Sequence, residues 1–132
     1  MKRKVGLWID HRKTVIVTLS GETEEIMQIA SNIDKQVRYS GGAEEISIED
    51  QRDRRFLDHL SKYYDEVISH IRDAESILIF GPGEAKGEFA KRLQSEDLGG
   101  RIVGVETVDK MTDGQIAARV RQHFTTRSAD EL

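Results

Sequence analysis

The fold class of this chain can be argued outward from residues 76–93, SILIFGPGEAKGEFAKRL. Residues 76–80 contain an uninterrupted apolar run, which is typical of a strand buried on both faces of a sheet. Gly81-Pro82-Gly83 ends that strand, and a helical pattern follows to about residues 98–100. The inward residues of this helix are Phe89, Ala90 and Leu93. A buried strand that leads directly into a helix predicts an α/β fold with parallel strands.

The C-terminal part repeats this order of strand and helix. Residues 101–108 contain the run IVGVETV and predict a second buried strand. Thr112 and Gln115 have the spacing of a capping box, which marks the start of a helix. The apolar positions of that closing helix are Ile116, Ala117, Val120 and Phe124. Residues 125–132 are polar, and we expect them to fray.

The N-terminal part has the pattern of an antiparallel meander. Residues 5–9 (VGLWI) and 14–19 (TVIVTL) are apolar runs separated by a short polar break, which predicts a hairpin. A turn at residues 20–22 precedes a third expected strand at residues 25–30. From Glu49 the pattern becomes helical. The residues expected on its broad inward face are Phe56, Leu57, Leu60, Tyr63, Tyr64, Val67, Ile68 and Ile71.

The expected element order is therefore β-β-β-α-β-α-β-α, a meander followed by two right-handed crossovers onto parallel strands. This order predicts a mixed five-stranded sheet with helices on both faces. No linker divides the 132 residues, so we expect a single domain over residues 1–132, with its core at 4–124 and a tail at 125–132.

Composition narrows the classes of function. The 20 basic and 24 acidic residues give a net charge of −4, so the chain is not a general polyanion binder, although a local basic face is compatible with it. The lack of cysteine excludes a disulfide, a thiolate nucleophile and a cysteine-ligated zinc. The apolar run after residues 2–4 is too short for a signal peptide, and no run is long enough to span a bilayer. We therefore expect a cytoplasmic protein with no membrane partner.

The loop between the strand at 76–80 and its helix is a candidate ligand site. Its candidate anion-binding residues are Gly81, Gly83, Lys86 and Gly87. A helix N-terminus presents free amides to an anion, and this loop resembles a loose dinucleotide fingerprint, with Glu106 near the distance expected for a ribose ligand. The alternative is a tight strand-to-helix turn in which Glu84 supports the helix dipole. The charge of Glu84 and the meander that precedes this unit favour the tight turn.

Asp10 follows the first expected strand, where ribonuclease-H-type nucleases carry a metal carboxylate. Two-metal chemistry needs further converging carboxylates, and the central strand ends in glycine and proline instead. Asp10 is therefore interpreted as a turn former that bonds its own backbone. The histidines have no metal-ligand spacing and are interpreted as surface or helix-edge groups: His11, His59, His70 and His123. No catalytic residue, metal or cofactor is predicted, and no triad order is recognisable.

A second candidate surface surrounds Gly41 and Gly42, in residues 36–56, QVRYSGGAEEISIEDQRDRRF. The clustered cations are Arg38, Arg52, Arg54 and Arg55. RNA phosphate is the natural partner of such a cluster. The alternative is a solvated helix face with local ion pairs, because acidic residues interleave with these cations. The acidic residues are Glu44, Glu45, Glu49, Asp50 and Asp53.

Three segments together resemble the central domain of archaeo-eukaryotic peptide-chain release factors. They are VGLWIDHRKTVIVTL at residues 5–19, SILIFGPGEAKGEFAKRL at 76–93 and IVGVETVDKMTDGQIAARV at 102–120. The most specific part is GVETVDKMTDGQ, and the resemblance covers roughly residues 4–124. The chain also resembles the small bacterial single-domain proteins related to those factors, often labelled translational machinery proteins. The resemblance implies a ribonuclease-H-like fold, of the kind found in translational machinery components.

The resemblance also bears on the glycine loop. In release factors, a glutamine beside the loop glycines assists ester hydrolysis at the peptidyl-transferase centre. Here Gly41 and Gly42 match the glycines, but Ala43 takes the place of the glutamine, and Glu44 and Glu45 replace the basic surroundings. The resemblance therefore implies that release activity is lost, as in the Pelota-type rescue factors, whose equivalent domain also lacks the glutamine.

The leading hypothesis is a non-enzymatic, translation-associated protein that binds the ribosome or RNA (rRNA or tRNA). Its contact surface would combine the two loop glycines with the four clustered arginines. Two alternatives from other classes stay open. One is a module that binds a small molecule or nucleotide at residues 81–87. The other is a homodimeric interaction or regulatory protein that associates through an exposed sheet edge or the long helix.

Overall fold

The structure is built on one mixed sheet. The computed structural model describes residues 3–31 and 48–130, with side chains at 3–31 and 54–125. The strands are β1 Arg3–Ile9, β2 Lys13–Ser20, β3 Thr23–Ala30, β4 Ser76–Gly81 and β5 Ile102–Thr107. They lie in the order β3-β2-β1-β4-β5, with β1–β2 and β2–β3 antiparallel and β1–β4 and β4–β5 parallel. The predicted α/β fold with a mixed five-stranded sheet is confirmed.

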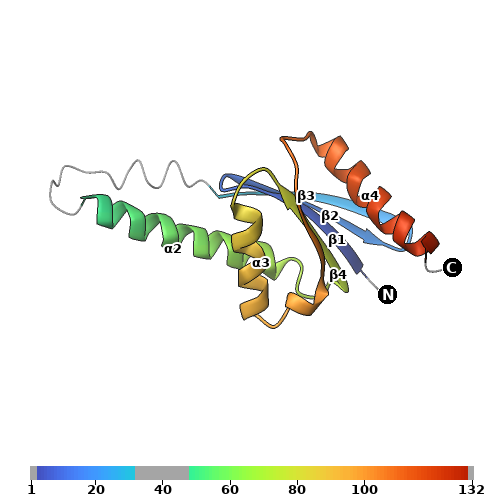
Figure 1. The fold of residues 1–132 in the computed structure, drawn as a ribbon, viewed down its shortest axis with the longest axis horizontal. Helices are drawn as coiled ribbons and strands as arrows, with labels where there is room; N and C mark the ends of the chain where they lie inside the picture. The colour runs from blue at the N-terminus through green and yellow to red at the C-terminus, as the bar shows by residue number, and fades with distance from the viewer. Residues whose placement is uncertain (1–2, 32–47, 131–132) are drawn as a thin grey trace.

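Helices cover both faces of this sheet, as the sequence predicts. Helices α2 (Ile48–Ser69) and α3 (Ala85–Ser95) pack on one face, and α4 (Asp113–Asp130) packs on the other (Figure 1). A short 3-10 helix, η1 (Gly99–Arg101), leads into β5. The crossover from β3 through α2 to β4 and the crossover from β4 through α3 to β5 advance in the same direction across the sheet, and for that reason α2 and α3 share a face.

Residues of β1 alternate between the two faces. Leu7 and Ile9 are buried in the cluster under α2 and α3, whereas Trp8 is buried in the cluster under α4. Gly6 also faces α4, and a Cβ atom there would lie 2.3 Å from Cγ2 of Val120. The missing side chain at Gly6 therefore lets α4 approach the sheet closely.

The start of α4 has the capping box that the sequence predicts. The amide of Gln115 donates to Oγ1 of Thr112 at 3.2 Å, and the amide of Thr112 donates to Oε1 of Gln115 at 2.9 Å. Both bonds satisfy amides that would otherwise be free at the helix start. The helix then runs to Asp130, so regular backbone continues beyond Thr125, where the polar tail begins.

The end of α3 differs from the prediction. The helix ends at Ser95 rather than near residues 98–100. Asp97 adopts a left-handed φ of 64°, and the amide of Leu98 donates to the carbonyl of Leu93 at 2.8 Å. This is a Schellman motif, in which a reversal directly after the helix satisfies its last carbonyls. An aspartate supplies the left-handed residue, so a prediction based on the nearby glycines places the end too late.

Two predictions of burial are wrong. Leu57 has the spacing of the inward face of α2, but its side chain is 63% exposed. The N-terminal part of α2 projects past the sheet (Figure 1), and Leu60 is the first buried residue among the described side chains of this helix. The strand at 101–108 is expected to be buried, but β5 is an edge strand in which Val105 is 44% exposed. Spacing indicates the side on which a residue lies, not whether another element covers it.

Candidate functional site

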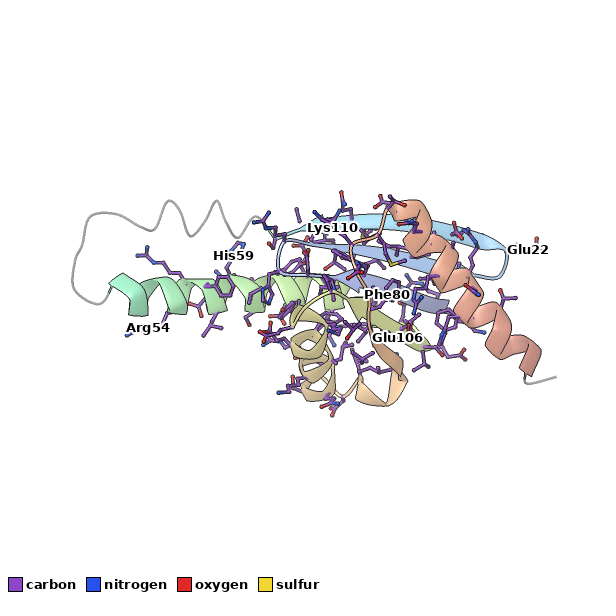
Figure 2. All side chains as sticks on the ribbon, turned by 45° about the horizontal axis from the view of Figure 1, so that its top comes forward. Glu22, Arg54, His59, Phe80, Glu106 and Lys110 are labelled. Atoms are coloured by element: carbon purple, nitrogen blue, oxygen red, sulfur yellow. The ribbon has the colours of Figure 1, made fainter. Side chains whose placement is uncertain are left out.

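The predicted RNA-contact residues fall only partly on the described chain. Outside the described residues lie Arg38, Gly41, Gly42 and the side chain of Arg52. Arg54 and Arg55 are exposed on α2, and Figure 2 labels Arg54 on the projecting part of this helix. Both arginines precede Leu60, so they stand where α2 has no cover from the sheet. These positions leave them accessible to a large partner.

Hydrogen bonds fix Ser31 where the chain leaves β3. The amide of Ser31 donates to the carbonyl of Arg12 at 2.8 Å, and its hydroxyl donates to the carbonyl of His11 at 2.6 Å. The carbonyl of Ser31 bonds to Nε2 of His59, a residue of α2 that Figure 2 labels. Because a carbonyl only accepts, Nε2 of His59 carries the proton in this contact. Ser31 is therefore tied both to the β1–β2 turn and to α2.

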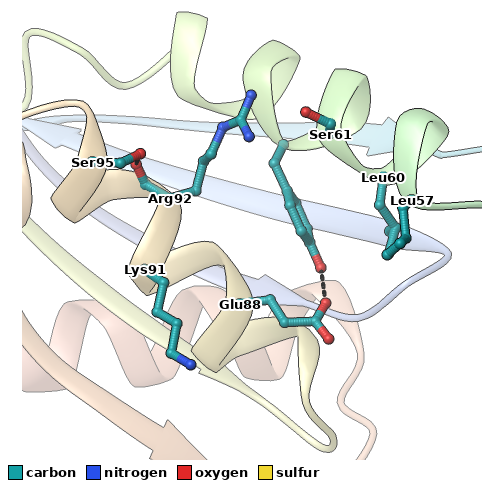
Figure 3. Close-up of a pocket in the computed structure, with 8 residues that line it drawn as sticks. Leu57, Leu60, Ser61, Glu88, Lys91, Arg92 and Ser95 are labelled. Atoms are coloured by element: carbon teal, nitrogen blue, oxygen red, sulfur yellow. Dashed lines mark hydrogen bonds between the residues drawn. The ribbon is translucent and has the colours of Figure 1, made fainter. Parts of the chain in front are cut away.

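A polar network lies where β1 ends. Nε2 of His11 is 3.0 Å from Oε1 of Glu88 on α3, and the hydroxyl of Tyr64 on α2 donates to the same oxygen at 2.7 Å (Figure 3). Burial, together with the bond to Glu88, raises the pKa of Tyr64 far above its ordinary value, so the phenol keeps its proton. The ring of Phe56 stands edge-on to His11, with 5.8 Å between centroids. The network thus joins the β1–β2 turn to both helices of this face.

Tyr63 holds the same turn from the buried side. Its hydroxyl donates to the carbonyl of Asp10 at 3.1 Å and lies 2.6 Å from Oγ1 of Thr14. Because the phenol has one proton, Thr14 is the donor in the second bond. Burial raises the pKa of Tyr63 well above its ordinary value. Oδ1 of Asp10 accepts from the amides of Arg12 and Lys13 at 2.7 and 2.8 Å, which confirms Asp10 as a turn former.

An open cleft of about 450 Å³ lies between α2 and α3 beside this network (Figure 3). Its lining residues are Leu57, Leu60, Ser61 and Tyr64 of α2 and Glu88, Lys91, Arg92 and Ser95 of α3. Nε and Nη2 of Arg92 donate to Oδ1 of Asp65 at 3.0 and 2.7 Å, which fixes this side chain at the rim. No sequence pattern predicts this cleft, because the residues that line it come from two helices whose packing no local pattern specifies.

The loop after β4 agrees with the tight-turn interpretation at Gly81. A Cβ atom there would lie 2.2 Å from the carbonyl oxygen of Ile9, so the approach of β1 requires glycine. Nζ of Lys86 bonds back to the carbonyl of Gly83, and Glu84 occupies the N-cap position of α3. Anion binding by this loop stays a prediction, and the charge of Glu84 opposes it.

The strand order does not support a dinucleotide site. In open α/β sheets the ligand crevice lies where the strand order reverses and successive helices take opposite faces. Here β1, β4 and β5 follow one another in one direction, and α2 and α3 share a face. Glu106, the expected ribose ligand, pairs with Arg119 of α4. Among the described side chains, at residues 3–31 and 54–125, no three metal-ligating groups gather in one place.

Comparison with known structures identifies proteins that share this fold. Pelota of Thermoplasma acidophilum has a TM-score of 0.56 and 16% identity, over 86% of this chain and 30% of that chain. The archaeal translation termination factor aRF1 has a TM-score of 0.51 and 13% identity, over 98% of this chain and 41% of that chain. Pelota of Archaeoglobus fulgidus has a TM-score of 0.52 and 16% identity, over 98% of this chain and 38% of that chain. No protein-family model and no curated protein matches the sequence.

These matches confirm the expected likeness to Pelota and to a release factor at the level of the fold. The chain spans 30% to 41% of the length of those proteins, so it corresponds to a part of each. No helix of the described chain has both the length and the apolar character needed to cross a membrane.

Proposed function

We propose that this chain is a translation-associated protein that binds the ribosome or RNA and does not hydrolyse peptidyl-tRNA. The observation that supports it is the fold, which matches Pelota and aRF1 over 86% to 98% of the chain. One of these proteins is a translation termination factor. The proposal includes a ribonuclease-H-like assignment of the fold and a relationship to bacterial single-domain translational machinery proteins. It also includes a cytoplasmic location, where ribosomes are found.

The proposed contact surface is the projecting part of α2 together with the glycine-containing segment before it. Arg54 and Arg55 are exposed there, and Arg52 lies on the same helix. The three arginines supply charges that phosphate groups can contact, although acidic residues lie between them and the whole chain has a net charge of −4. Binding through phosphates should weaken steeply as salt rises.

Sedimentation of ribosomes through sucrose gradients tests this proposal. We expect the full chain to move with ribosomes or subunits at low salt and to leave them at high salt. Replacing Arg52, Arg54 and Arg55 together by alanine should abolish the movement, because it removes the proposed phosphate contacts. A control that replaces the exposed Lys62, Lys91 and Lys110 by alanine changes net charge equally and should leave it intact. A chain that stays at the top of the gradient at every salt concentration would rule out the proposal.

The absence of hydrolysis rests on Ala43, which stands after Gly41 and Gly42 in place of the glutamine that release factors use. A peptidyl-tRNA hydrolysis assay on programmed ribosomes should show no release above background. Ala43→Gln is the matched variant, since it restores the residue type at that position. Release by the unchanged chain would contradict this part of the proposal and leave ribosome binding intact.

A ligand-binding module is the second candidate, and the cleft between α2 and α3 is the observation that favours it. Its volume of about 450 Å³ lies within the range of small-molecule sites, roughly 300 to 1,000 Å³. A nucleotide or metabolite at 100 times its dissociation constant should stabilise the fold by roughly 2.7 kcal/mol, which a thermal-shift screen detects. If a ligand binds in the cleft, Lys91→Ala should abolish the change in melting temperature that the ligand causes. If the ligand binds in the loop after β4, Lys86→Ala should abolish it instead.

A further inference from the structure

The two edges of the sheet differ in how they are protected. At one edge, β3 pairs with β2 in an unbroken register from Lys13↔Ala30 to Ser20↔Thr23. Residues 23–28 are all exposed, and the neighbours Ile26 and Met27 are 47% and 43% exposed. Because successive residues of a strand point to opposite faces, apolar surface is open on both sides of this edge. An edge of this kind offers a row of unpaired backbone groups to another strand.

The opposite edge is irregular. The β4–β5 pairing carries a register shift between Ile77 and Leu78, and β5 has six residues against eight in β3. Short edge strands and irregular registers are two of the devices by which proteins discourage edge-to-edge pairing. Neither device is present in β3, which has no proline or lysine and whose two charged residues, Glu24 and Glu25, lie in its N-terminal half. The sheet is therefore open to strand addition at β3 rather than at β5.

We infer that β3 pairs antiparallel with β3 of a second copy of this chain, so that two five-stranded sheets form one continuous sheet. Such a contact is isologous, because each copy offers the same strand, and it closes after two copies. It would cover Ile26 and Met27 on both sheet faces and satisfy the edge backbone groups. This pairing uses none of the arginines of α2 on which the proposed ribosome contact relies.

The distribution of charge along β3 restricts the register. A two-fold axis at Glu24 or Glu25 would place identical carboxylates directly opposite each other, which destabilises a strand pair. An axis at Ile26 places Glu25 opposite Met27 of the second copy, and an axis at Met27 places Glu25 opposite Ile29. Glu24 also accepts a hydrogen bond within the same copy, from Nη1 of Arg121 on α4 to its Oε1 at 2.7 Å. The axis is therefore expected at Ile26 or Met27.

Cysteine cross-linking tests the register directly, because the natural chain has no cysteine. Residues that face themselves across a two-fold axis have Cβ atoms about 4.5–5.5 Å apart, close to disulfide geometry. We expect either Ile26→Cys or Met27→Cys to give a covalent dimer under mild oxidation. Thr23→Cys is the control, since residue 23 would lie at least six residues along the strand from its copy, or about 20 Å. Equal cross-linking of all three variants would indicate random collision and overturn the inference.

The state of the unmodified chain completes the test. Sedimentation equilibrium of the full chain should show a monomer–dimer equilibrium, and Ile26→Lys should shift it to monomer by at least tenfold in dissociation constant. Residue 26 is half exposed, so the lysine variant should keep its circular dichroism spectrum and melting temperature. A monomer at every concentration would overturn the inference. If that monomer bound ribosomes and Ile26→Lys abolished the binding, the edge would belong to another partner.

Discussion

Beneath α4 the sheet is closely packed and apolar, whereas beneath α2 and α3 its carboxyl end carries bonded hydroxyl, carboxylate and imidazole groups. Trp8 and Phe80 are fully buried on the first face, and Gly6 has no side chain to separate it from α4. On the second face the hydroxyl of Tyr63 donates to the β1–β2 turn, and the hydroxyl of Tyr64 donates to α3. Both faces bury apolar side chains, but only the face beneath α2 and α3 also uses side-chain hydrogen bonds to join the β1–β2 turn to the two helices that cover it.

Trp8→Ala should have the largest effect on the free energy of unfolding. It removes a fully buried ring and leaves a cavity under α4, so we expect a loss of about 3–5 kcal/mol. Urea denaturation should be followed by circular dichroism, because Trp8 is the one tryptophan of the chain. Leu57→Ala, at a 63% exposed position, is the control and should change stability by less than about 0.5 kcal/mol. Similar losses for the two variants would contradict the description of the α4 face.

Gly6→Ala tests the close approach of α4. The added Cβ atom would lie 2.3 Å from Val120, and relief requires either the helix or the valine to move. Overpacking of this kind costs about 1–3 kcal/mol. Gly83→Ala is the matched control, because a Cβ atom there meets nothing within 4 Å. A melting temperature unchanged by Gly6→Ala would mean that α4 sits further from the sheet than described.

The second face should respond to alkaline pH. Tyrosine in the unfolded chain ionises near pH 10.0, whereas burial keeps Tyr63 and Tyr64 protonated in the fold. Above that pH the unfolded chain binds fewer protons, so the free energy of unfolding falls as pH rises, by about 1.4 kcal/mol per pH unit for each tyrosine. Below it these residues add no pH dependence. Urea titrations from about pH 9 to 11 should show this slope reduced in Tyr63→Phe, and an equal slope in that variant would count against the network.

Glu88→Gln should have the smallest effect. The amide oxygen can still accept from Tyr64, and only the charge facing His11 is lost. The Glu88 side chain is 41% exposed, so water screens the pair and we expect a loss below about 1 kcal/mol. Thermal denaturation near neutral pH measures it. A loss of several kcal/mol would contradict the screening of this pair by water and show that the charge of Glu88 is a major contributor to stability.

The sequence was sufficient for the order of the elements, the mixed sheet and the Thr112–Gln115 cap, because these depend on spacing within short segments. It was insufficient wherever distant segments meet. The Tyr64–Glu88 bond joins residues 24 apart, and nothing local to either residue indicates it. His11 and His59, interpreted as surface or helix-edge groups, are half-buried in specific hydrogen bonds. Leu57 has the spacing of a core residue, and only the length of α2 relative to the sheet exposes it.

The anchoring of Ser31 has a mechanical consequence. The described chain stops at Ser31, which is bonded to His59, and resumes at Ile48, where α2 begins. His59 and Ile48 lie on one rigid helix, eleven residues or about 16 Å apart. A force that acts between Ser31 and Ile48 is therefore transmitted to α2 at two positions, His59 and Ile48. The hydrogen bonds of His11, Tyr63 and Tyr64 join α2 to the β1–β2 turn and to α3. A force that a partner applies to α2 is therefore transmitted to the sheet and to α3.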